Sequence, residues 1–279
     1  MALPSDIAQQ LATRAAALGP FARVPQYHAR VTSTNDVAAA LAEAGAPEGA
    51  WVVAEEQTAG RGRRGRTWES PAGAGLYLSV VFRPRAEGGA DDRATPLLTL
   101  MAGVAAATGV RAATGLAATL KWPNDLVIEP PGERERGGLS RFRKLAGILA
   151  EASATGGDLQ FVVLGIGVNL TPAAYAPEVA ARATSIEGEL GRPADRALVL
   201  VEILSALADR RRRLVDGRQD ELLADWRALA PSSVGRRVHW MAGDRRRHGV
   251  TQGIDASGAL MVKTDGHVER IIAGDVQWE

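Results

Sequence analysis

Apolar positions follow two different patterns along the chain, and the change between them divides it into two parts. Up to about residue 230, apolar runs that predict buried strands are separated by segments with helical spacing. Beyond Pro231 the apolar residues fall into short runs between Gly and Asp turns, as in a small antiparallel β structure. The pattern therefore predicts an α+β or α/β domain over residues 1–230 and a small β domain over 231–279.

Within the first part, residues typical of helix starts and ends mark the expected elements. Ser33 opens a helix that ends at Ala44, with Asp36 placed three residues on as in a capping box. The other expected helices cover residues 6–18, 97–113, 196–215 and 220–230. The expected strands cover residues 24–31, 51–54, 76–82, 118–122, 126–128, 144–151 and 161–170, then 238–241, 247–254, 259–262 and 268–272. The strand from Lys144 is expected to pair back across the polar segment 130–141.

Composition limits the function classes. The 279 residues carry a formal net charge of only +1, so any basic binding site must be local. There is no cysteine, which excludes disulfides and thiolate chemistry and fits a reducing cytosol. The four histidines have no metal-ligand spacing along the chain, so a histidine-based zinc site is not expected. No signal peptide or membrane span is expected either.

One stretch concentrates unusual chemistry. Four arginines and three glycines alternate from Gly60 to Arg66, and Trp68 follows two places later. Glycines allow a backbone to approach a ligand, and arginines offer donor forks that match phosphate and carboxylate oxygens. The stretch is a candidate cradle for a polyanion, with Trp68 as a stacking surface. A solvated basic loop, or one that grips any nucleic acid, is the alternative.

The stretch does not fit any of three known classes of glycine-rich loop. It matches G-x-G-x-x-G and follows a strand, but Pro71 and two further glycines prevent the helix that a dinucleotide site requires. The G-K-[ST] of a Walker A loop is absent, as are the H-R-D and D-F-G of protein kinases. The loop must therefore belong to another kind of site.

Other segments place polar residues at the ends of predicted elements. They are Ser33-Thr34-Asn35 at a helix start, Lys121-Trp-Pro-Asn-Asp125, Lys144 at the start of a strand, and Asn169 at the end of another. Each has a plain structural alternative, such as a cap, a turn former or a surface lysine. The ammonium of Lys144 would be partly desolvated and could meet an anionic intermediate, and together with the Arg/Gly loop these segments indicate more than structural roles.

In this order, these motifs resemble the biotin–protein ligases. The matching residues are Ser33-Thr-Asn35, Glu56–Arg66 with Trp68, Lys121–Asp125, Arg143–Leu149 and Gly165-Ile-Gly-Val-Asn169. The resemblance implies a class II synthetase-like catalytic domain, a mixed sheet with flanking helices, plus a C-terminal SH3-like β barrel. It implies that Mg·ATP and biotin form biotinyl-5′-AMP, and that biotin then passes to a lysine of the biotin carboxyl carrier protein of acyl-CoA carboxylases.

The resemblance also implies roles for individual residues. Lys144, Asp125 and Arg63 would be catalytic, with Asp125 orienting the incoming lysine or acting as its base. Biotin would be bound by Ser33, Thr34, Asn35, Gln57, Gly60, Arg61, Gly62, Arg63, Lys144 and Gly147. ATP and the adenylate would be bound by Arg63, Arg64, Arg66, Trp68, Asn124 and Asn169. The Gly60–Arg66 loop would close over the adenylate, and the metal ligands are not implied.

Two rival functions remain at this point. A lipoate–protein ligase or octanoyltransferase shares the superfamily, but the Arg/Gly loop and Lys121–Asp125 favour biotin. A DNA-binding regulator would use the Arg/Gly loop and Arg210–Arg213. Fewer than 30 residues precede the matching region, too few for the helix-turn-helix of some family members, so repressor activity is not expected. A cytoplasmic monomer or homodimer is expected, and the segment 130–141 has no assigned role.

Overall fold

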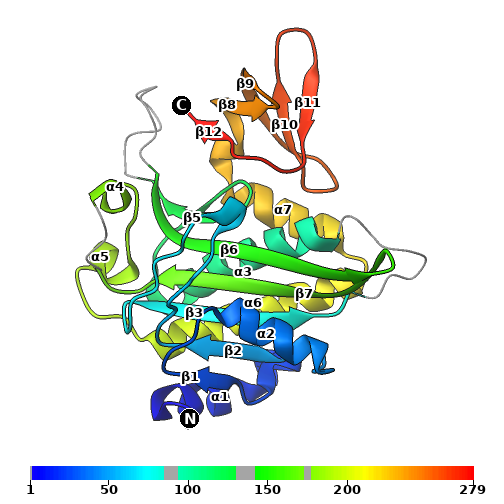
Figure 1. Ribbon diagram of the computed structural model, residues 1–279. Coiled ribbons are helices and arrows are strands. Elements are labelled where there is room, and N and C mark those ends of the chain that lie inside the picture. Colours follow the sequence, from blue (N-terminus) through cyan, green and yellow to red (C-terminus); the bar gives the residue numbers. More distant parts are fainter. Residues whose placement is uncertain (1, 85–93, 130–141, 173–176) are drawn as a thin grey trace.

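Two sheets of different construction organise the protein (Figure 1). The structure is a computed structural model that describes residues 2–84, 94–129, 142–172 and 177–279. Residues up to 169 build a seven-stranded mixed sheet flanked by helices, and the last part of the chain builds a five-stranded antiparallel sheet. The expected α+β catalytic fold followed by a small β structure is confirmed.

The larger sheet has the strand order β1-β2-β3-β7-β6-β5-β4. Its strands are β1 (Gln26–His28), β2 (Trp51–Ala54), β3 (Gly75–Phe82), β4 (Thr119–Lys121), β5 (Asp125–Ile128), β6 (Arg143–Thr155) and β7 (Asp158–Asn169). Only the β1–β2 pair among these is parallel. β5 pairs with β6 as expected, while the connecting segment 130–141 lies outside the described residues. β1 is shorter than the expected 24–31, and β6 runs four residues beyond the expected end.

Five helices match the predicted positions: α1 (Ser5–Leu18), α2 (Thr34–Glu43), α3 (Ala94–Thr114), α6 (Arg196–Val215) and α7 (Gln219–Leu229). Two short helices, α4 (Pro177–Ala180) and α5 (Ile186–Leu190), were not predicted. Ser185 caps α5 by accepting a hydrogen bond from the Gly188 amide at 3.2 Å. Helices this short give too few periodic positions for the sequence pattern to reveal them.

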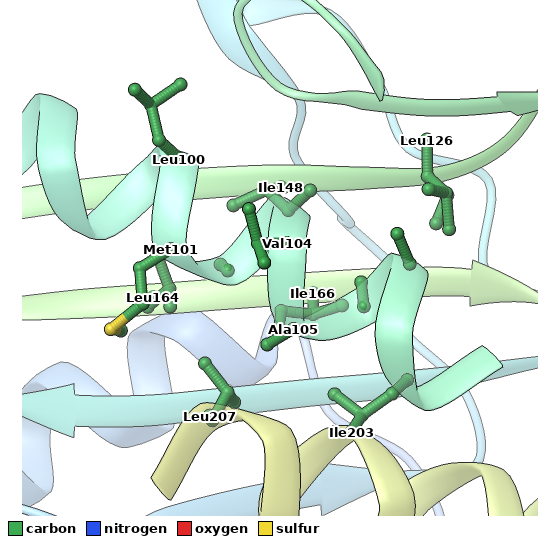
Figure 2. Packing of buried hydrophobic residues seen from close by; sticks show 14 of the residues in the cluster. Leu100, Met101, Val104, Ala105, Leu126, Ile148, Leu164, Ile166, Ile203 and Leu207 are labelled. Atoms are coloured by element: carbon green, nitrogen blue, oxygen red, sulfur yellow. The ribbon is translucent and has the colours of Figure 1, made fainter. Parts of the chain in front are cut away.

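Helix α3 fills the centre of the core. Its apolar side chains pack on β6 and β7 through Ile148, Leu164 and Ile166, and on α6 through Ile203 and Leu207 (Figure 2). By length and composition alone the segment Pro96–Thr114 could cross a membrane, but 61% of its most apolar window is buried inside the protein. We therefore interpret its hydrophobicity as that of a core helix.

The smaller sheet has the order β11-β10-β9-β8-β12 and begins directly after a short 3₁₀ turn, η3 (Pro231–Ser233). Its strands are β8 (Val234–Ala242), β9 (Arg245–Ile254), β10 (Leu260–Lys263), β11 (Val268–Ile271) and β12 (Gln277–Trp278). Val238, Trp240 and Leu260 belong to the same hydrophobic cluster as the core around α3. The Trp122 indole also donates to the Gly258 carbonyl at 3.0 Å, so the two parts of the chain are packed together.

The arginine run at the end of α6 is held by carboxylates. Arg211 bonds Glu48 at 2.7 and 2.9 Å, and Arg210 lies 2.6 Å from Asp209. Arg212 and Arg213 also contact Asp209, at 2.7 and 2.9 Å. These ion pairs account for the run as part of the fold, which removes much of the support for a nucleic-acid patch there.

The α3–α6 contact gives a stability prediction. A methyl group at Gly109 would lie 2.5 Å from the backbone nitrogen of Ile203. Overpacking costs about 1–3 kcal/mol, while alanine gains about 1 kcal/mol over glycine in a helix. Gly109→Ala should therefore lower the free energy of unfolding, measured in urea, by on the order of 1 kcal/mol.

Gly103→Ala is the matched control on the same helix. Its methyl group would meet only the Leu120 side chain, at 3.2 Å, so stability should be unchanged or slightly higher. Equal unfolding midpoints for the parent and Gly109→Ala would show that the two helices are not in such close contact.

Candidate active site

A cavity of about 710 Å³ opens on one face of the larger sheet. Its walls come from the start of α2, the Arg/Gly loop, strands β3 to β7 and the segment 274–277 before and within β12. Among the predicted site residues, the lining includes Ser33, Thr34, Asn35, Gln57, Arg61, Gly62, Arg63, Arg64, Arg66, Trp68, Asn124, Asp125, Lys144, Gly147 and Asn169. Residues more than 130 positions apart in the sequence thus meet in one place.

Gly60 is the predicted site residue that this lining does not include. A Cβ at this position would lie 2.4 Å from the Trp68 carbonyl oxygen and 2.8 Å from Ser70 Oγ. The Gly60 carbonyl accepts a hydrogen bond from the Trp68 amide at 2.9 Å. Glycine is required here because two stretches of backbone pass each other closely.

One end of the cavity is a network of buried polar side chains. Ser33 caps α2 by accepting from the Asn35 amide at 3.3 Å. The amide and hydroxyl of Thr34 both donate to Gln57 Oε1, at 2.8 and 3.0 Å. Ser79 Oγ lies 2.7 Å from Thr34 Oγ1 and 2.6 Å from Asn35 Oδ1. Because each group fixes the next, the end presents a preorganised set of donors and acceptors.

The floor of the cavity is made of glycine backbone. Gly147 on β6 and Gly167 on β7 are direct cross-strand partners, and the Trp68 ring lies over them. A Cβ at Gly167 would be 2.5 Å from Trp68 Nε1, and one at Gly147 would be 3.0 Å from Trp68 Cζ3. At Gly165 a Cβ would be 2.4 Å from Asn35 Oδ1. Flat groups can therefore lie directly against these two strands.

The Arg/Gly loop folds back on itself like a hairpin. The Gly62 amide donates to the Arg66 carbonyl at 2.7 Å, and Arg61 forms an antiparallel bridge with Thr67. At the tip, Arg64 has φ +57° and Gly65 has φ +71°. Arg64 is the one non-glycine residue with positive φ in the part of the chain that the structure describes, so the tip stores some backbone strain.

The arginines of this loop differ in their partners. Arg61 reaches Asp36 at 2.7 Å and Glu151 at 3.0 Å, and hydrogen bonds to these carboxylates raise its pKa. Asp36 therefore binds the loop rather than completing a capping box. Arg66 forms an ion pair with Asp275, from the C-terminal part of the chain. Both ends of the loop are thus tied to carboxylates outside it.

Arg63 lies in a different environment. Burial, together with the positive charge of Arg64, lowers the pKa of Arg63, while Asp125 and Asp275 act in the opposite direction. A guanidinium that is partly desolvated and close to another cation gains stability from an anionic ligand. Arg63 is therefore well placed to bind a negatively charged group in the cavity.

Two lysines add positive charge at the other end of the cavity. Lys144 Nζ lies 2.6 Å from Asp125 Oδ1 and 5.3 Å from the centre of the Trp68 ring. Lys121 Nζ lies 5.8 Å from the centre of the Phe142 ring. Burial lowers the pKa of Lys121, and Asp125 opposes this shift. The arrangement surrounds one carboxylate with cations next to two aromatic rings.

The two predicted asparagines hold the backbone around the cavity. Asn124 Nδ2 donates to the Ile148 carbonyl at 2.7 Å. Asn169 Nδ2 donates to the carbonyls of Thr184 at 2.9 Å and Lys144 at 3.3 Å. Asn124 thus ties the turn between β4 and β5 to β6, and Asn169 ties the end of β7 to the start of β6.

Several lining or supporting residues were missed by sequence reasoning. Ser79 lies inside the apolar run 76–82, where its small polar side chain was the only available signal. Glu151, Phe142 and Asp275 carry no local signal, since their place at the site depends on strand pairing and on contact with the C-terminal sheet. Lys121 also lines the cavity, and its motif Lys121–Asp125 gives this lysine no role of its own.

Comparison with known proteins places this geometry in context. Residues 27–169 match the model of the biotin/lipoate A/B protein ligase family, and residues 234–278 match the biotin protein ligase C terminal domain. The chain is 38% identical over 253 residues to the biotin–[acetyl-CoA-carboxylase] ligase of Paracoccus denitrificans, covering 89% of this chain and 98% of that protein.

One further relative and one solved structure agree with these matches. The bifunctional ligase/repressor BirA of Bacillus subtilis is 33% identical over 253 residues, with 90% of this chain and 73% of that protein covered. Among solved structures, the biotin protein ligase from Aquifex aeolicus in complex with biotin and ATP superposes with a TM-score of 0.73 at 24% identity. That match covers 91% of this chain and 97% of the other, and it supports the fold.

The role of Asn169 gives a prediction for stability. Asn169→Ala removes the donor to the part-buried Thr184 carbonyl, while the Lys144 carbonyl keeps its bond from the Thr184 amide, and a carbonyl that loses its donor costs about 1–3 kcal/mol. Urea denaturation should show a loss of unfolding free energy in this range. Gln252→Ala, which removes an exposed amide side chain on β9, should leave it unchanged within about 0.5 kcal/mol. Equal losses in both variants would contradict the bridging role.

Proposed function

The chain belongs to the biotin/lipoate A/B protein ligase family, and on this basis we propose that it joins biotin to a carrier-protein lysine at the expense of ATP. The enzyme is a biotin ligase, and its acceptor is the biotin carrier of a carboxylase. The observation that carries the proposal is the cavity itself. A preorganised polar end, a backbone floor and a group of cations lie along one continuous space.

The polar end favours biotin over lipoate. The ureido ring of biotin has one carbonyl acceptor and two N–H donors, while the dithiolane ring of lipoate has neither. Thr34, Asn35 and Gln57 supply both donors and acceptors where that ring would lie. The dithiolane ring offers this network no donor or acceptor, and a site that recognises its ligand by hydrogen bonds discriminates strongly against an analogue without those groups. The match of residues 234–278 to the biotin ligase C-terminal domain agrees with this choice.

In the first step, a biotin carboxylate oxygen attacks the α-phosphorus of ATP. The new O–P bond forms as the bond to the β-phosphate oxygen breaks, giving biotinyl-5′-AMP and pyrophosphate. Negative charge builds up on the phosphoryl oxygens, and fixed cations stabilise it. Lys144 and Arg63 are the cations that we assign to this role, because both line the cavity and Arg63 is partly desolvated.

In the second step, the neutral amine of the carrier lysine attacks the acyl carbon of the mixed anhydride. The C–N bond forms, the C–O bond to AMP breaks, and the amine gives up a proton. We assign Asp125 to orient the incoming ammonium or to accept its proton. Its carboxylate lies in the cavity and already holds one ammonium group, that of Lys144, at 2.6 Å.

The nucleotide would occupy the side of the cavity near the loop. We assign Arg64 and Arg66 to the phosphates, for which Arg66 must exchange its ion pair with Asp275 for the nucleotide, and Trp68, Asn124 and Asn169 to the adenine side. Mg²⁺ would enter with ATP, and Mg²⁺ commonly binds one or two carboxylates in addition to substrate phosphates. Three carboxylates line the cavity, those of Glu69, Asp125 and Asp275, and the last two are paired with Lys144 and Arg66.

We further propose a cytoplasmic enzyme, monomeric or homodimeric, without a role in DNA binding. ATP is a cytoplasmic substrate, and the absence of cysteine suits a reducing compartment. The ion pairs of Arg210–Arg213 support the exclusion of DNA, because these arginines are engaged by Asp209, Glu48, Glu221 and Asp225.

The choice of substrate is tested by pyrophosphate release. With Mg·ATP and biotin the protein should release pyrophosphate, whereas lipoate in place of biotin should support a rate lower by a factor on the order of 10⁴. Addition of a biotin carrier domain should then yield a product heavier by one biotinyl group, seen by mass spectrometry. Release with lipoate but not with biotin would overturn the assignment.

The role of Lys144 is tested by substitution. Lys144→Ala should slow adenylate formation by about 100- to 1,000-fold, the usual loss when one group that stabilises transition-state charge is removed. Its thermal unfolding should stay close to that of the parent. Lys263→Ala, which removes an exposed lysine of β10, should keep the parent rate. An unchanged adenylation rate in folded Lys144→Ala would refute this role.

A further inference from the structure

The outer face of the C-terminal sheet carries two histidines and one glutamate from neighbouring strands. His239 on β8 and His248 on β9 are direct cross-strand partners. On the other side of β8, Gln277 of β12 pairs with His239, and Glu279 follows two residues later. The opposite face of β8 is apolar, since Val238 and Trp240 are buried in the core. The backbone thus places three side chains that can each offer a metal-binding atom on the exposed side.

The three side chains converge on a small space. His239 Nδ1 lies 3.0 Å from Glu279 Oε1, and His248 Nδ1 lies 3.4 Å from the same oxygen. The three potential ligand atoms all lie within 4.8 Å of one another. Around a tetrahedral zinc ion with bonds of about 2.0–2.1 Å, neighbouring ligand atoms are about 3.3 Å apart. The two distances from Glu279 to the histidines are therefore close to those of a formed site, and the two histidines lie within 4.8 Å of each other.

We propose that His239, His248 and Glu279 form a binding site for a divalent transition-metal ion, with Zn²⁺ as the ion that it fits best. Two imidazoles and one carboxylate make a common three-ligand set for zinc, and a water molecule completes the tetrahedron. The site lies outside the catalytic cavity, whose lining includes none of the three residues. The His248 side chain is exposed to solvent, which leaves room for its ring to turn toward the other two ligands.

A pair of hydrogen bonds is the competing explanation for the cluster. In that case both imidazoles would donate an Nδ1 proton to one carboxylate oxygen. The hydrogen bond from His239 also holds the pKa of Glu279 below its usual range. The two explanations differ in their consequences, because the same nitrogen cannot hold a proton and a metal ion at once. Only the metal site predicts binding of a defined amount of Zn²⁺.

Metal binding would also fix a strand that reaches the cavity. Gly274, Asp275, Val276 and Gln277 line the cavity, and Glu279 follows two residues after Gln277 in the chain. A metal ion bound by both Glu279 and His239 would link the end of the chain after β12 to β8, in addition to the backbone pairing of these two strands.

Zinc titration of tag-free, chelator-treated protein tests the proposal. Isothermal titration calorimetry should give about one equivalent of bound Zn²⁺. His248→Gln and Glu279→Gln should each weaken binding by more than about 100-fold, since each removes a ligand rather than an outer partner. His267→Gln, an exposed histidine outside the cluster, is the matched control and should bind as the parent does.

Co²⁺ provides a second readout that does not depend on enzyme activity. Bound at this site in place of Zn²⁺, it should give a visible absorption spectrum typical of tetrahedral nitrogen and oxygen coordination. This spectrum should be lost in His248→Gln and kept in His267→Gln. The proposal is overturned if the parent binds no Zn²⁺, or if both ligand variants bind it as tightly as the parent. Neither outcome bears on biotin ligation, so the two proposals stand or fall separately.

Discussion

The cavity depends on the absence of side chains at a few positions of the central sheet. Gly147 and Gly167 face each other across β6 and β7, and the residues that follow them, Ile148 and Val168, point to the opposite face and into the core. Two adjacent strands therefore carry the hydrophobic core on one side and the floor of the site on the other. Any methyl group on the floor would displace either the Trp68 ring or the Asn35 amide.

Ion pairs between residues far apart in the sequence determine where charge lies around this floor. The Arg/Gly loop concentrates four cations in seven residues, an arrangement that would repel itself if left unpaired. Arg61 is neutralised by Asp36 and Glu151 at one end, and Arg66 by Asp275 at the other. Arg63 and Arg64, in the middle of the loop, line the same cavity as Lys144. The loop is thus anchored at its ends while its centre is left for an anion.

From the sequence alone, we could predict the elements that a local pattern determines and the site residues that the order of motifs identifies. β2 and α6 occur at the predicted residues, because a buried apolar run and a capped amphipathic repeat are signals contained in the segment itself. Most of the expected site residues line one cavity, since their order along the chain carried a family resemblance. Partners that come together only through tertiary packing were not predictable. Asp275 meets Arg66 from the segment between β11 and β12, and His239 meets His248 only because two strands pair in one particular register.

The shared core has a consequence for how the protein comes apart. Trp240 and Leu260 of the small sheet lie in the same apolar cluster as Leu126 and Ile148 of the large one. Removing the small sheet would expose this surface to water, and the lost burial would weaken the large sheet as well. The change of pattern near Pro231 therefore marks a boundary in architecture but not in cooperativity. The two sheets are expected to unfold in a single transition, as one thermodynamic unit.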